Sequence, residues 1–296
     1  MYHEYTGERV IIMACSDCNT KCKHCYISYK GNFTGEDLFQ TACALMESGY
    51  SVSINGTEPL IHKEYLKTYE LIGQKRALTN GLVFKDNFEY LDEINVHGIS
   101  ALNISYHFDL HNQISSVPKS YLDILWREIL SRGMKFTINC TISTSNMYRI
   151  PQYCKEALSL GAFRIRFTNL LNQGTAHYLE NDLLLSDSQI DYVLDSINNA
   201  RKLFSKDDLY IERCGSFGAN SRTKNFYCPA GMDRVFLTPN RKVYSCVFMT
   251  QPGYEIGFYK DRKIYISDEY SNDGKQCQTL NILNNNRNRL VKNNSL

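Results

Sequence analysis

Three cysteines stand close together in one short segment near the start of the chain. Cys18, Cys22 and Cys25 follow a Cys-x3-Cys-x2-Cys pattern, so a single loop can bring their three thiolates to one metal centre. A structural site normally closes its coordination with a fourth protein ligand, whereas a catalytic site keeps one position open. Lys21 and Lys23 can offset part of the negative charge of the thiolates. We therefore expect these cysteines to be catalytic ligands of a [4Fe-4S] cluster with one open iron.

A zinc site is the alternative for the same segment. His24 or Cys15 would supply the fourth ligand of a zinc knuckle. Such knuckles occur in small modules that fold around their metal, and the flanking sequence does not have that character. The cluster is therefore the favoured interpretation.

The remaining cysteines fall into two groups. Four lie in the last third of the chain and could close a second cluster completely: Cys214, Cys228, Cys246 and Cys277. One or two of these could instead be ordinary buried thiols. Cys43, Cys140 and Cys154 have apolar neighbours, which indicates packing, whereas Cys15 ends an expected strand and could face a cavity. The odd total of 11 cysteines and their uneven clustering argue against a disulfide framework.

The elements that must position these cysteines alternate between strands and helices. An apolar run at 10–14 predicts a buried strand directly before the cysteine loop, and helical spacing after Thr34 predicts a helix that stops at Gly49. Further strands are expected at 51–54, 77–79, 101–105, 135–142 and 163–167. Further helices are expected near 63–72 and 87–94, and at 119–131, 150–160 and 187–204.

Six strand-helix units in succession imply parallel strands, because only long connections can join parallel neighbours. Six units are too few to close an eight-stranded barrel. We therefore expect an α/β fold with a partial (β/α)6 TIM barrel over residues 1–205.

A change of pattern from about residue 206 indicates a second, smaller module. Strands at 235–238 and 242–248 predict a hairpin that turns at 239–241. We expect a cysteine-rich module over 206–280, followed by a poorly ordered tail at 281–296.

Composition excludes several classes of function. The 296 residues are 43% apolar, and 33 basic against 31 acidic residues leave a net charge of +2. This balance, and the absence of an RNA-binding appendage, argue against nucleic acid as a partner. Residues 1–9 lack the pattern of a signal peptide, and no apolar stretch is long enough to span a bilayer. We expect a cytoplasmic protein without membrane association.

Together with the alternating units, the cysteine loop resembles the radical S-adenosylmethionine (SAM) superfamily. In that family SAM chelates the open iron of the cluster and is reductively cleaved to a 5′-deoxyadenosyl radical. Gly56-Thr57-Glu58-Pro59-Leu60, after the second expected strand, resembles the family's Gly-Gly-Glu-Pro segment, which receives the methionyl amino group. Thr79-Asn80-Gly81 resembles its Thr-Asn-Gly turn after the third strand.

The fourth and sixth strands extend the resemblance. Ile104-Ser105-Tyr106-His107 with His111-Asn112 is similar to a Ser-x-Asp-x…His-Asp stretch of the peptide-modifying branch, which lies near the SAM ribose and carboxylate. Arg166 would point from the sixth strand toward the same crevice and can pair with that carboxylate. The SAM contacts implied in this way are His24, Tyr26, Gly56, Thr57, Glu58, Asn80, Ser105 and Arg166.

Three positions depart from the family pattern. Thr57 stands where the family usually has glycine, so the backbone there must suit a β-branched residue. His24 replaces an aromatic residue beside the last ligand and can still stack near adenine. Tyr106 stands in place of the acidic residue of the fourth strand.

The later cysteines resemble the Twitch auxiliary module, a shortened, SPASM-like extension. The segments Cys228-Pro229-Ala230-Gly231 and Val243-Tyr244-Ser245-Cys246 flank the expected hairpin. The resemblance implies a second, auxiliary [4Fe-4S] cluster near the barrel mouth, with Cys214, Cys228, Cys246 and Cys277 as ligands. If Cys214 or Cys277 is not a ligand, its weak S–H bond suits it to give a hydrogen atom to a substrate radical.

The resemblance implies an enzyme that abstracts a substrate hydrogen, in maturation of a ribosomally synthesised peptide by epimerisation, cross-linking or oxidation. A flavodoxin- or ferredoxin-type protein would supply the electron. Because the first strand begins near residue 10, we expect no leader-recognition domain. A radical SAM dehydrogenase acting on a small metabolite is the alternative enzyme. A non-catalytic iron-sulfur electron-transfer or sensor protein is the alternative from another class, and it would leave the segment 56–60 unexplained.

Overall fold

Strands and helices alternate along the computed structural model, which describes residues 1–179, 181–218, 227–272 and 274. The barrel strands are β2 (Arg9–Met13), β3 (Ser51–Asn55), β4 (Arg76–Thr79), β5 (Ala101–Ser105), β6 (Lys135–Ile142), β7 (Arg164–Asn169) and β8 (Tyr210–Arg213). The helices are α1 (Gly35–Glu47), α2 (Leu66–Leu71), α3 (Glu89–Val96), α4 (His111–Ile114), α5 (Lys119–Ser131), α6 (Ile150–Ser159) and α7 (Asp187–Leu203). Each expected strand-helix unit is present.

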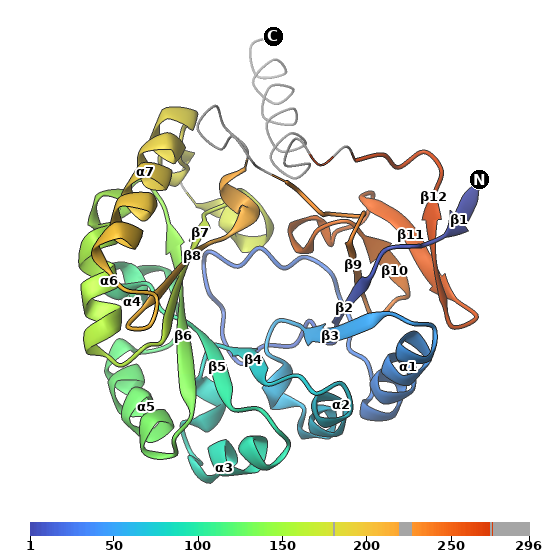
Figure 1. The fold of residues 1–296 in the computed structure, drawn as a ribbon, viewed down its shortest axis with the longest axis horizontal. Coiled ribbons are helices and arrows are strands. Elements are labelled where there is room, and N and C mark those ends of the chain that lie inside the picture. The colour runs from blue at the N-terminus through green and yellow to red at the C-terminus, as the bar shows by residue number, and fades with distance from the viewer. Residues whose placement is uncertain (180, 219–226, 273, 275–296) are drawn as a thin grey trace.

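The barrel strands form an open arc with the helices on its outer side (Figure 1). Strands β4 to β8 make one parallel sheet in sequential order, and β2 pairs in parallel with β3 in a second sheet. The expected α/β partial barrel is therefore confirmed. Strand β8 was not predicted from the sequence. It pairs with β7 and continues the arc beyond the sixth unit.

A seam separates β3 from β4, which are edge strands of the two sheets. The Gln74 side chain bridges it. Its Oε1 accepts a hydrogen bond from the Ile54 N–H (2.7 Å), and its Nε2 donates to the carbonyls of Ile54 (2.9 Å) and Arg76 (2.8 Å). Edge strands leave backbone groups without ladder partners, so this one amide substitutes for pairing that the two strands do not make.

The strands of the cysteine-rich part extend the sheet that contains β2. They are β9 (Arg234–Leu237), β10 (Lys242–Tyr244), β11 (Glu255–Lys260) and β12 (Lys263–Ser267), with β1 (Tyr2–Glu4) at the edge. The expected hairpin is present: β9 and β10 are antiparallel, and Arg241 in the turn has a positive φ of 64°. Its second strand ends at Tyr244, earlier than expected.

Strand β9 pairs in parallel with β2, so the cysteine-rich part and the barrel share a sheet. The strand β8, which lies beyond residue 206, belongs to the barrel arc. The division into 1–205 and 206–280 stays a prediction, and the tail 281–296 lies outside the described residues.

Local signals explain why α1 forms where it does. Thr34 caps it, since its Oγ1 accepts a hydrogen bond from the Asp37 N–H at 3.1 Å. Leu38 and Leu45 are fully buried on the face that covers the sheet. Gly49 follows the helix with a φ of +89°, a conformation that glycine adopts without strain.

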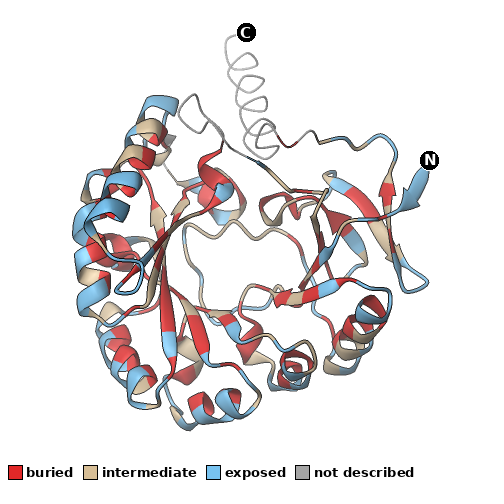
Figure 2. Cartoon of the chain, in the orientation of Figure 1, coloured by how far each residue is buried: buried red, intermediate tan, exposed pale blue. Residues whose placement is uncertain are grey.

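Along the strands of the arc, buried residues alternate with less buried ones (Figure 2). On β2, Val10 and Ile12 are fully buried in the main core, whereas Ile11 lines a cavity on the inner side. Cys140 and Cys154 are also fully buried in the main core, which confirms their packing role. The arc is therefore filled with side chains on its helical side and hollow on its inner side.

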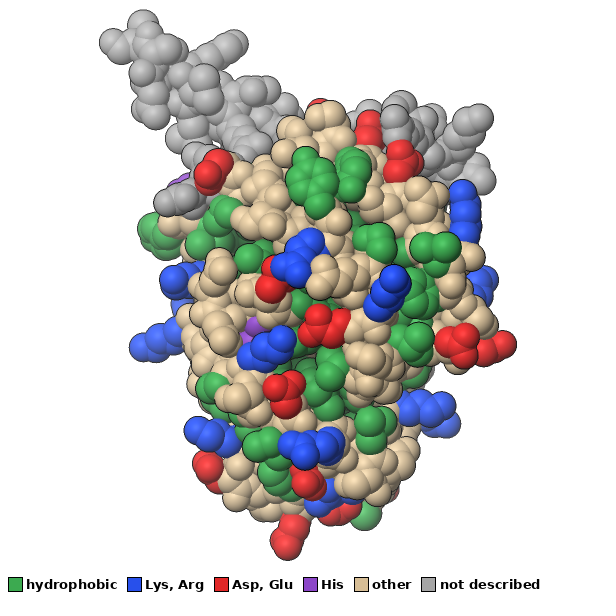
Figure 3. Space-filling model, turned by 90° about the vertical axis from the view of Figure 1, so that its left-hand side faces the viewer, with side chains coloured by type: hydrophobic (Ala, Val, Ile, Leu, Met, Phe, Trp, Pro, Cys, Tyr) green, Lys and Arg blue, Asp and Glu red, His purple; other side chains and the backbone are tan. Residues whose placement is uncertain are grey.

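The outer surface carries charges of both signs. On the face shown in Figure 3, basic and acidic side chains are interspersed and do not gather into areas of one sign. Among the described helices, none has the combination of length and apolar character that crossing a membrane requires. A cytoplasmic location stays a prediction.

Candidate active site

Both sets of cysteines line one cavity on the inner side of the arc. The cavity has a volume of ≈ 980 Å³, and Cys18, Cys22, Cys25, Cys214, Cys228 and Cys246 are all part of its wall. The seventh expected ligand, Cys277, lies outside the described residues. None of the ten described cysteines is in a disulfide bond. Cys15 is fully buried in the core and is not part of this wall.

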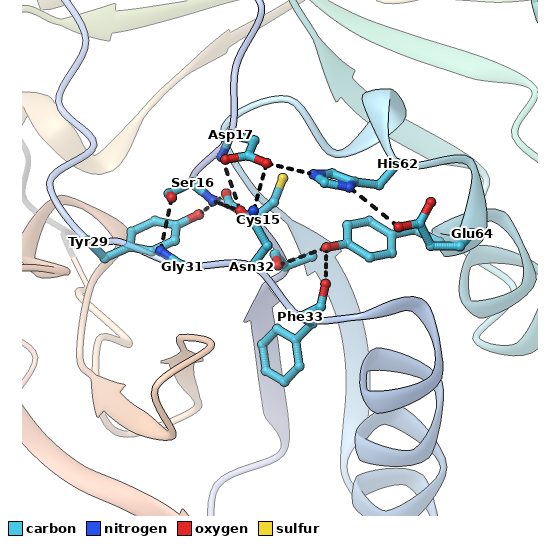
Figure 4. A network of polar contacts seen from close by, with 11 residues as sticks. Cys15, Ser16, Asp17, Tyr29, Gly31, Asn32, Phe33, His62 and Glu64 are labelled. Atoms are coloured by element: carbon cyan, nitrogen blue, oxygen red, sulfur yellow. Dashed lines mark hydrogen bonds and ion pairs between the residues drawn. The ribbon is translucent and has the colours of Figure 1, made fainter.

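A polar network closes the neck of the cysteine loop (Figure 4). Asn32 Oδ1 accepts hydrogen bonds from the backbone N–H groups of Ser16 (3.0 Å) and Asp17 (3.3 Å), and Asn32 Nδ2 donates to Asp17 Oδ2 at 2.6 Å. Asp17 Oδ2 lies 3.4 Å from His62 Nε2. An isolated antiparallel bridge joins Cys15 to Asn32. The two ends of the loop are therefore fixed to each other.

The segment after β7 holds the loop from the barrel side. The Thr175 hydroxyl donates to the carbonyl oxygen of Cys22 (2.9 Å), and the Thr175 N–H donates to that of Cys25 (2.8 Å). A Cβ at Gly174 would lie 2.3 Å from the Cys25 carbonyl oxygen, so only glycine permits this close approach. Sequence reasoning missed both residues, because their only signal was a Gly-Thr pair after an expected strand.

Partial desolvation affects two of the loop cysteines. It raises the pKa of the Cys18 and Cys25 thiols. Because desolvation disfavours the thiolates, a bound cation is the partner that would keep them ionised.

His24 and His107 meet edge to face on the cavity wall, with ring centroids 4.5 Å apart. His24 Nδ1 lies 3.0 Å from the Ile114 carbonyl oxygen, so that nitrogen carries the proton. His107 Nδ1 accepts a hydrogen bond from the Thr141 N–H at 3.1 Å, so its proton is on Nε2. Burial lowers the pKa of both rings. Both histidines are therefore neutral and have fixed tautomers.

Tyr106, which stands in place of the acidic residue of the family pattern, lies away from the cavity. It is fully buried in the core, it is not part of the cavity wall, and its hydroxyl donates to Glu156 Oε1 at 3.2 Å. The next residue, His107, reaches the cavity instead. Alternation along the extended backbone explains the difference, because Ser105 and His107 point to the side opposite Tyr106.

The segment 56–60 packs onto the end of β2. The Thr57 N–H donates to the Cys15 carbonyl oxygen at 3.0 Å, and a Cβ at Gly56 would lie 3.1 Å from Cys15 Sγ. Gly56 and Thr57 line the cavity, but Glu58 is fully buried behind its wall. Burial raises the pKa of Glu58 to about 7. Glu58 Oε2 accepts a hydrogen bond from the Asn80 N–H at 2.6 Å.

The other expected cofactor contacts, Tyr26, Asn80, Ser105 and Arg166, all line the cavity. Arg166 is directed toward the second set of cysteines, since its Nη2 donates to Cys214 Sγ at 3.7 Å and its Nε lies 3.7 Å from Glu212 Oε1. This placement differs from the expected pairing with a SAM carboxylate, which stays a prediction.

Tyr26 lies between the two sets of cysteines. Its ring packs edge to face on Phe248 with centroids 4.7 Å apart. Burial raises the pKa of Tyr26, and the nearby Cys25 and Cys214 raise it further. The two sets therefore face each other across one aromatic side chain.

The donor set fits a cluster better than a single metal ion. In the part of the chain that the structure describes, no group of three or more His, Cys, Asp or Glu side chains converges on one ion. Each thiolate of an iron-sulfur cluster binds its own iron, so such convergence is not needed for a cluster. A zinc knuckle does need it, because its ligands surround one ion.

Polar atoms without partners show that the cavity suits a polar cofactor. Thr57 Oγ1, Asn103 Oδ1, His107 Nε2 and Asn169 Oδ1 belong to wall residues, are buried and have no hydrogen-bond partner among the described residues. Buried polar groups are normally hydrogen-bonded. These atoms are the ones that a bound molecule with its own donors and acceptors, such as SAM, would satisfy.

Comparisons with known proteins identify the fold. SuiB of Streptococcus suis, solved bound to the precursor peptide SuiA, matches with a TM-score of 0.65 and 16% identity over 83% of this chain. The enzyme anSMEcpe, solved with AdoMet and the Cp18Cys peptide, matches with a TM-score of 0.63 and 16% identity over 86% of this chain and 77% of its own. Both are radical SAM enzymes, so the resemblance expected from the motifs is confirmed for the fold.

One curated protein is similar to this chain in sequence. Pre-heme d1 synthase of Dinoroseobacter shibae is 26% identical over 179 residues, which cover 53% of this chain. The chain spans 42% of that relative and 61% of SuiB. A scan against protein-family models found no match.

Proposed function

We propose that this chain, which has the fold of SuiB and anSMEcpe, is a radical SAM enzyme that abstracts a hydrogen atom from a peptide. The observation that carries the proposal is the shared cavity. The loop cysteines, Gly56, Thr57, Asn80 and Ser105 are far apart in sequence, yet all line one wall. The ends of parallel strands gather such residues at one rim, where ligands of α/β folds bind.

The residues of the chain would divide the work as follows. Cys18, Cys22 and Cys25 would hold a [4Fe-4S] cluster, and Thr175 would keep their loop in place. When bound, the cluster supplies the electron that cleaves SAM to the 5′-deoxyadenosyl radical, after a flavodoxin- or ferredoxin-type protein has reduced it. The unpartnered polar atoms of Thr57 and His107 would orient SAM.

We assign the second set of cysteines to an auxiliary [4Fe-4S] cluster in a Twitch-like module. Cys214, Cys228 and Cys246 all line the cavity and would supply three thiolates, and Cys277 would be the fourth ligand. A backbone contact holds Cys228: its N–H donates to the Gly274 carbonyl oxygen at 2.9 Å. If Cys214 is not a ligand, its place in the cavity suits it to give a hydrogen atom to a substrate radical.

A peptide is the proposed substrate, modified by epimerisation, cross-linking or oxidation. Solved structures of SuiB and anSMEcpe hold peptides, and this chain covers most of the anSMEcpe chain. The cavity of ≈ 980 Å³ lies at the upper end of the size range of cofactor and ligand sites.

A small metabolite is the second candidate substrate. The relative named pre-heme d1 synthase supports it, since that name refers to a small-molecule product. In this case the chain would act as a radical SAM dehydrogenase, and the auxiliary cluster would accept an electron.

Release of 5′-deoxyadenosine tests the proposal. The holoenzyme, reconstituted anaerobically with iron and sulfide and given dithionite and SAM, should release this product. Cys22→Ala should not, whereas the matched control Cys43→Ala, whose thiol lies on α1 outside the cavity wall, should behave as the wild type does. A wild type that binds a cluster and releases no 5′-deoxyadenosine would instead be an electron-transfer or sensor protein.

A further inference from the structure

The hydroxyl of Thr20 lies against two of the three loop sulfurs. Thr20 Oγ1 is 3.0 Å from Cys18 Sγ and 3.6 Å from Cys22 Sγ. Asn80, from the turn after β4, approaches the same place with its amide nitrogen 3.5 Å from Cys18 Sγ. Polar groups from two separate segments therefore lie within hydrogen-bond distance of Cys18 Sγ.

The chemistry of the sulfurs fixes the direction of these hydrogen bonds. A cysteine that binds iron is a thiolate without a proton, so it can only accept. Thr20 has one hydroxyl proton, and the shorter distance assigns it to Cys18. One N–H of Asn80 donates to Asn19 Oδ1 at 2.9 Å, and the other is shared between Cys18 Sγ (3.5 Å) and Thr20 Oγ1 (3.4 Å).

Cys25, the third cysteine of the loop, has a different environment from Cys18. Among the described residues, no side chain forms a hydrogen bond with Cys25 Sγ, which has only a backbone hydrogen bond at Ile27. Ser115 Oγ lies 3.9 Å from Cys22 Sγ, so among the described residues side-chain donors reach Cys18 and Cys22 but not Cys25. Such asymmetry matters because hydrogen bonds to the ligand sulfurs help to set the reduction potential of an iron-sulfur cluster.

We propose that Thr20 is a positioning residue that raises the reduction potential of the loop cluster through its hydrogen bond to the Cys18 thiolate. Reduction adds one electron from the reductant to the cluster, and no bond forms or breaks. The added charge spreads onto the sulfurs, so a donor beside Cys18 stabilises the reduced state more than the oxidised state. The inference rests on the proposed function, because it needs a cluster in this loop.

Redox titration of a reconstituted variant tests the inference. Thr20→Val keeps the shape of the side chain and removes its donor, so its cluster should have a more negative midpoint potential than the wild type, with the same iron content. Thr20→Ser keeps the hydroxyl and should restore the wild-type potential. Thr168→Val makes the same chemical change elsewhere on the cavity wall and should leave the potential unchanged.

The outcomes separate this inference from the proposed function. Equal potentials in the wild type and Thr20→Val, at equal iron content, would overturn the role of Thr20 alone. A wild type that takes up no iron would overturn the proposed function as well. If Thr20→Val fails to retain iron, Thr20→Ala removes the donor without a branched side chain, and an unchanged potential in that variant also overturns the inference.

Discussion

The buried carboxylate of Glu58 accepts a hydrogen bond from the backbone N–H of Asn80 at 2.6 Å. Glu58 follows β3 and Asn80 follows β4, so the bond crosses the seam where the two sheets of the arc meet without strand pairing. The Asn80 side chain in turn reaches the cysteine loop. Glu58, which the sequence predicted to be a cofactor contact, therefore holds the turn at Asn80, and this turn contacts the cysteine loop.

Glu58 should make stability depend on pH. Its folded-state pKa of about 7 lies above the ordinary value of 4.5, so the folded state holds the proton more tightly. Its contribution to stability is complete below the ordinary pKa and is lost as pH rises through about 7. Glu58→Gln removes this loss, which is at most about 3 kcal/mol. The thermal unfolding temperature of the wild type should fall relative to that of the variant as the pH rises from 5 to 8. Parallel pH profiles of the two unfolding temperatures would contradict this.

Gly174 should be needed for the cysteine loop to keep its position. Gly174→Ala places a Cβ 2.3 Å from the Cys25 carbonyl oxygen and should displace the loop. Gly133→Ala is the matched control, because Gly133 also has a positive φ (+68°) and a Cβ there has no neighbour within 4 Å. Both changes should cost about 1 kcal/mol in backbone strain, but only Gly174→Ala should lower the iron bound after reconstitution. Equal iron content in the two variants would show that the close approach is unimportant.

The network at the two ends of the cysteine loop should tolerate the exchange of Asn32 and Asp17 for each other. Asn32→Asp places a second carboxylate beside Asp17 and removes the bond from Asn32 Nδ2, which should lower the free energy of unfolding by about 1–2 kcal/mol. Adding Asp17→Asn restores an amide that donates to a carboxylate, and the carboxylate introduced at position 32 can still accept from the backbone of Ser16. Denaturant unfolding of the double variant should return toward the wild-type value. A double variant less stable than Asn32→Asp would contradict the pairing.

Iron content should reveal the second cluster. The wild type should bind about eight irons per chain after anaerobic reconstitution, and Cys228→Ala or Cys246→Ala should bind about four. Cys43→Ala should keep the wild-type value. A wild type that binds about four irons, unchanged by Cys228→Ala and Cys246→Ala, would exclude the auxiliary cluster.

The sequence alone determined the features that depend on local spacing. Periodic apolar residues and caps such as Thr34 predicted the six strand-helix units and the hairpin, because secondary structure follows from neighbours within a few positions. The Cys-x3-Cys-x2-Cys segment predicted a metal loop for the same reason. The parallel topology followed from the lengths of the connections.

Only the tertiary structure decided which distant residues meet the loop. Asn32 and Thr175 contact it, yet neither stands in a pattern that local sequence spacing reveals. Thr175 bonds to Cys22 across 153 positions of sequence, and that contact exists only because β7 brings its carboxyl end to the rim where β2 also ends. Strand order and the alternation of side chains set which residues face the cavity, and these are properties of the assembled barrel and not of any one segment.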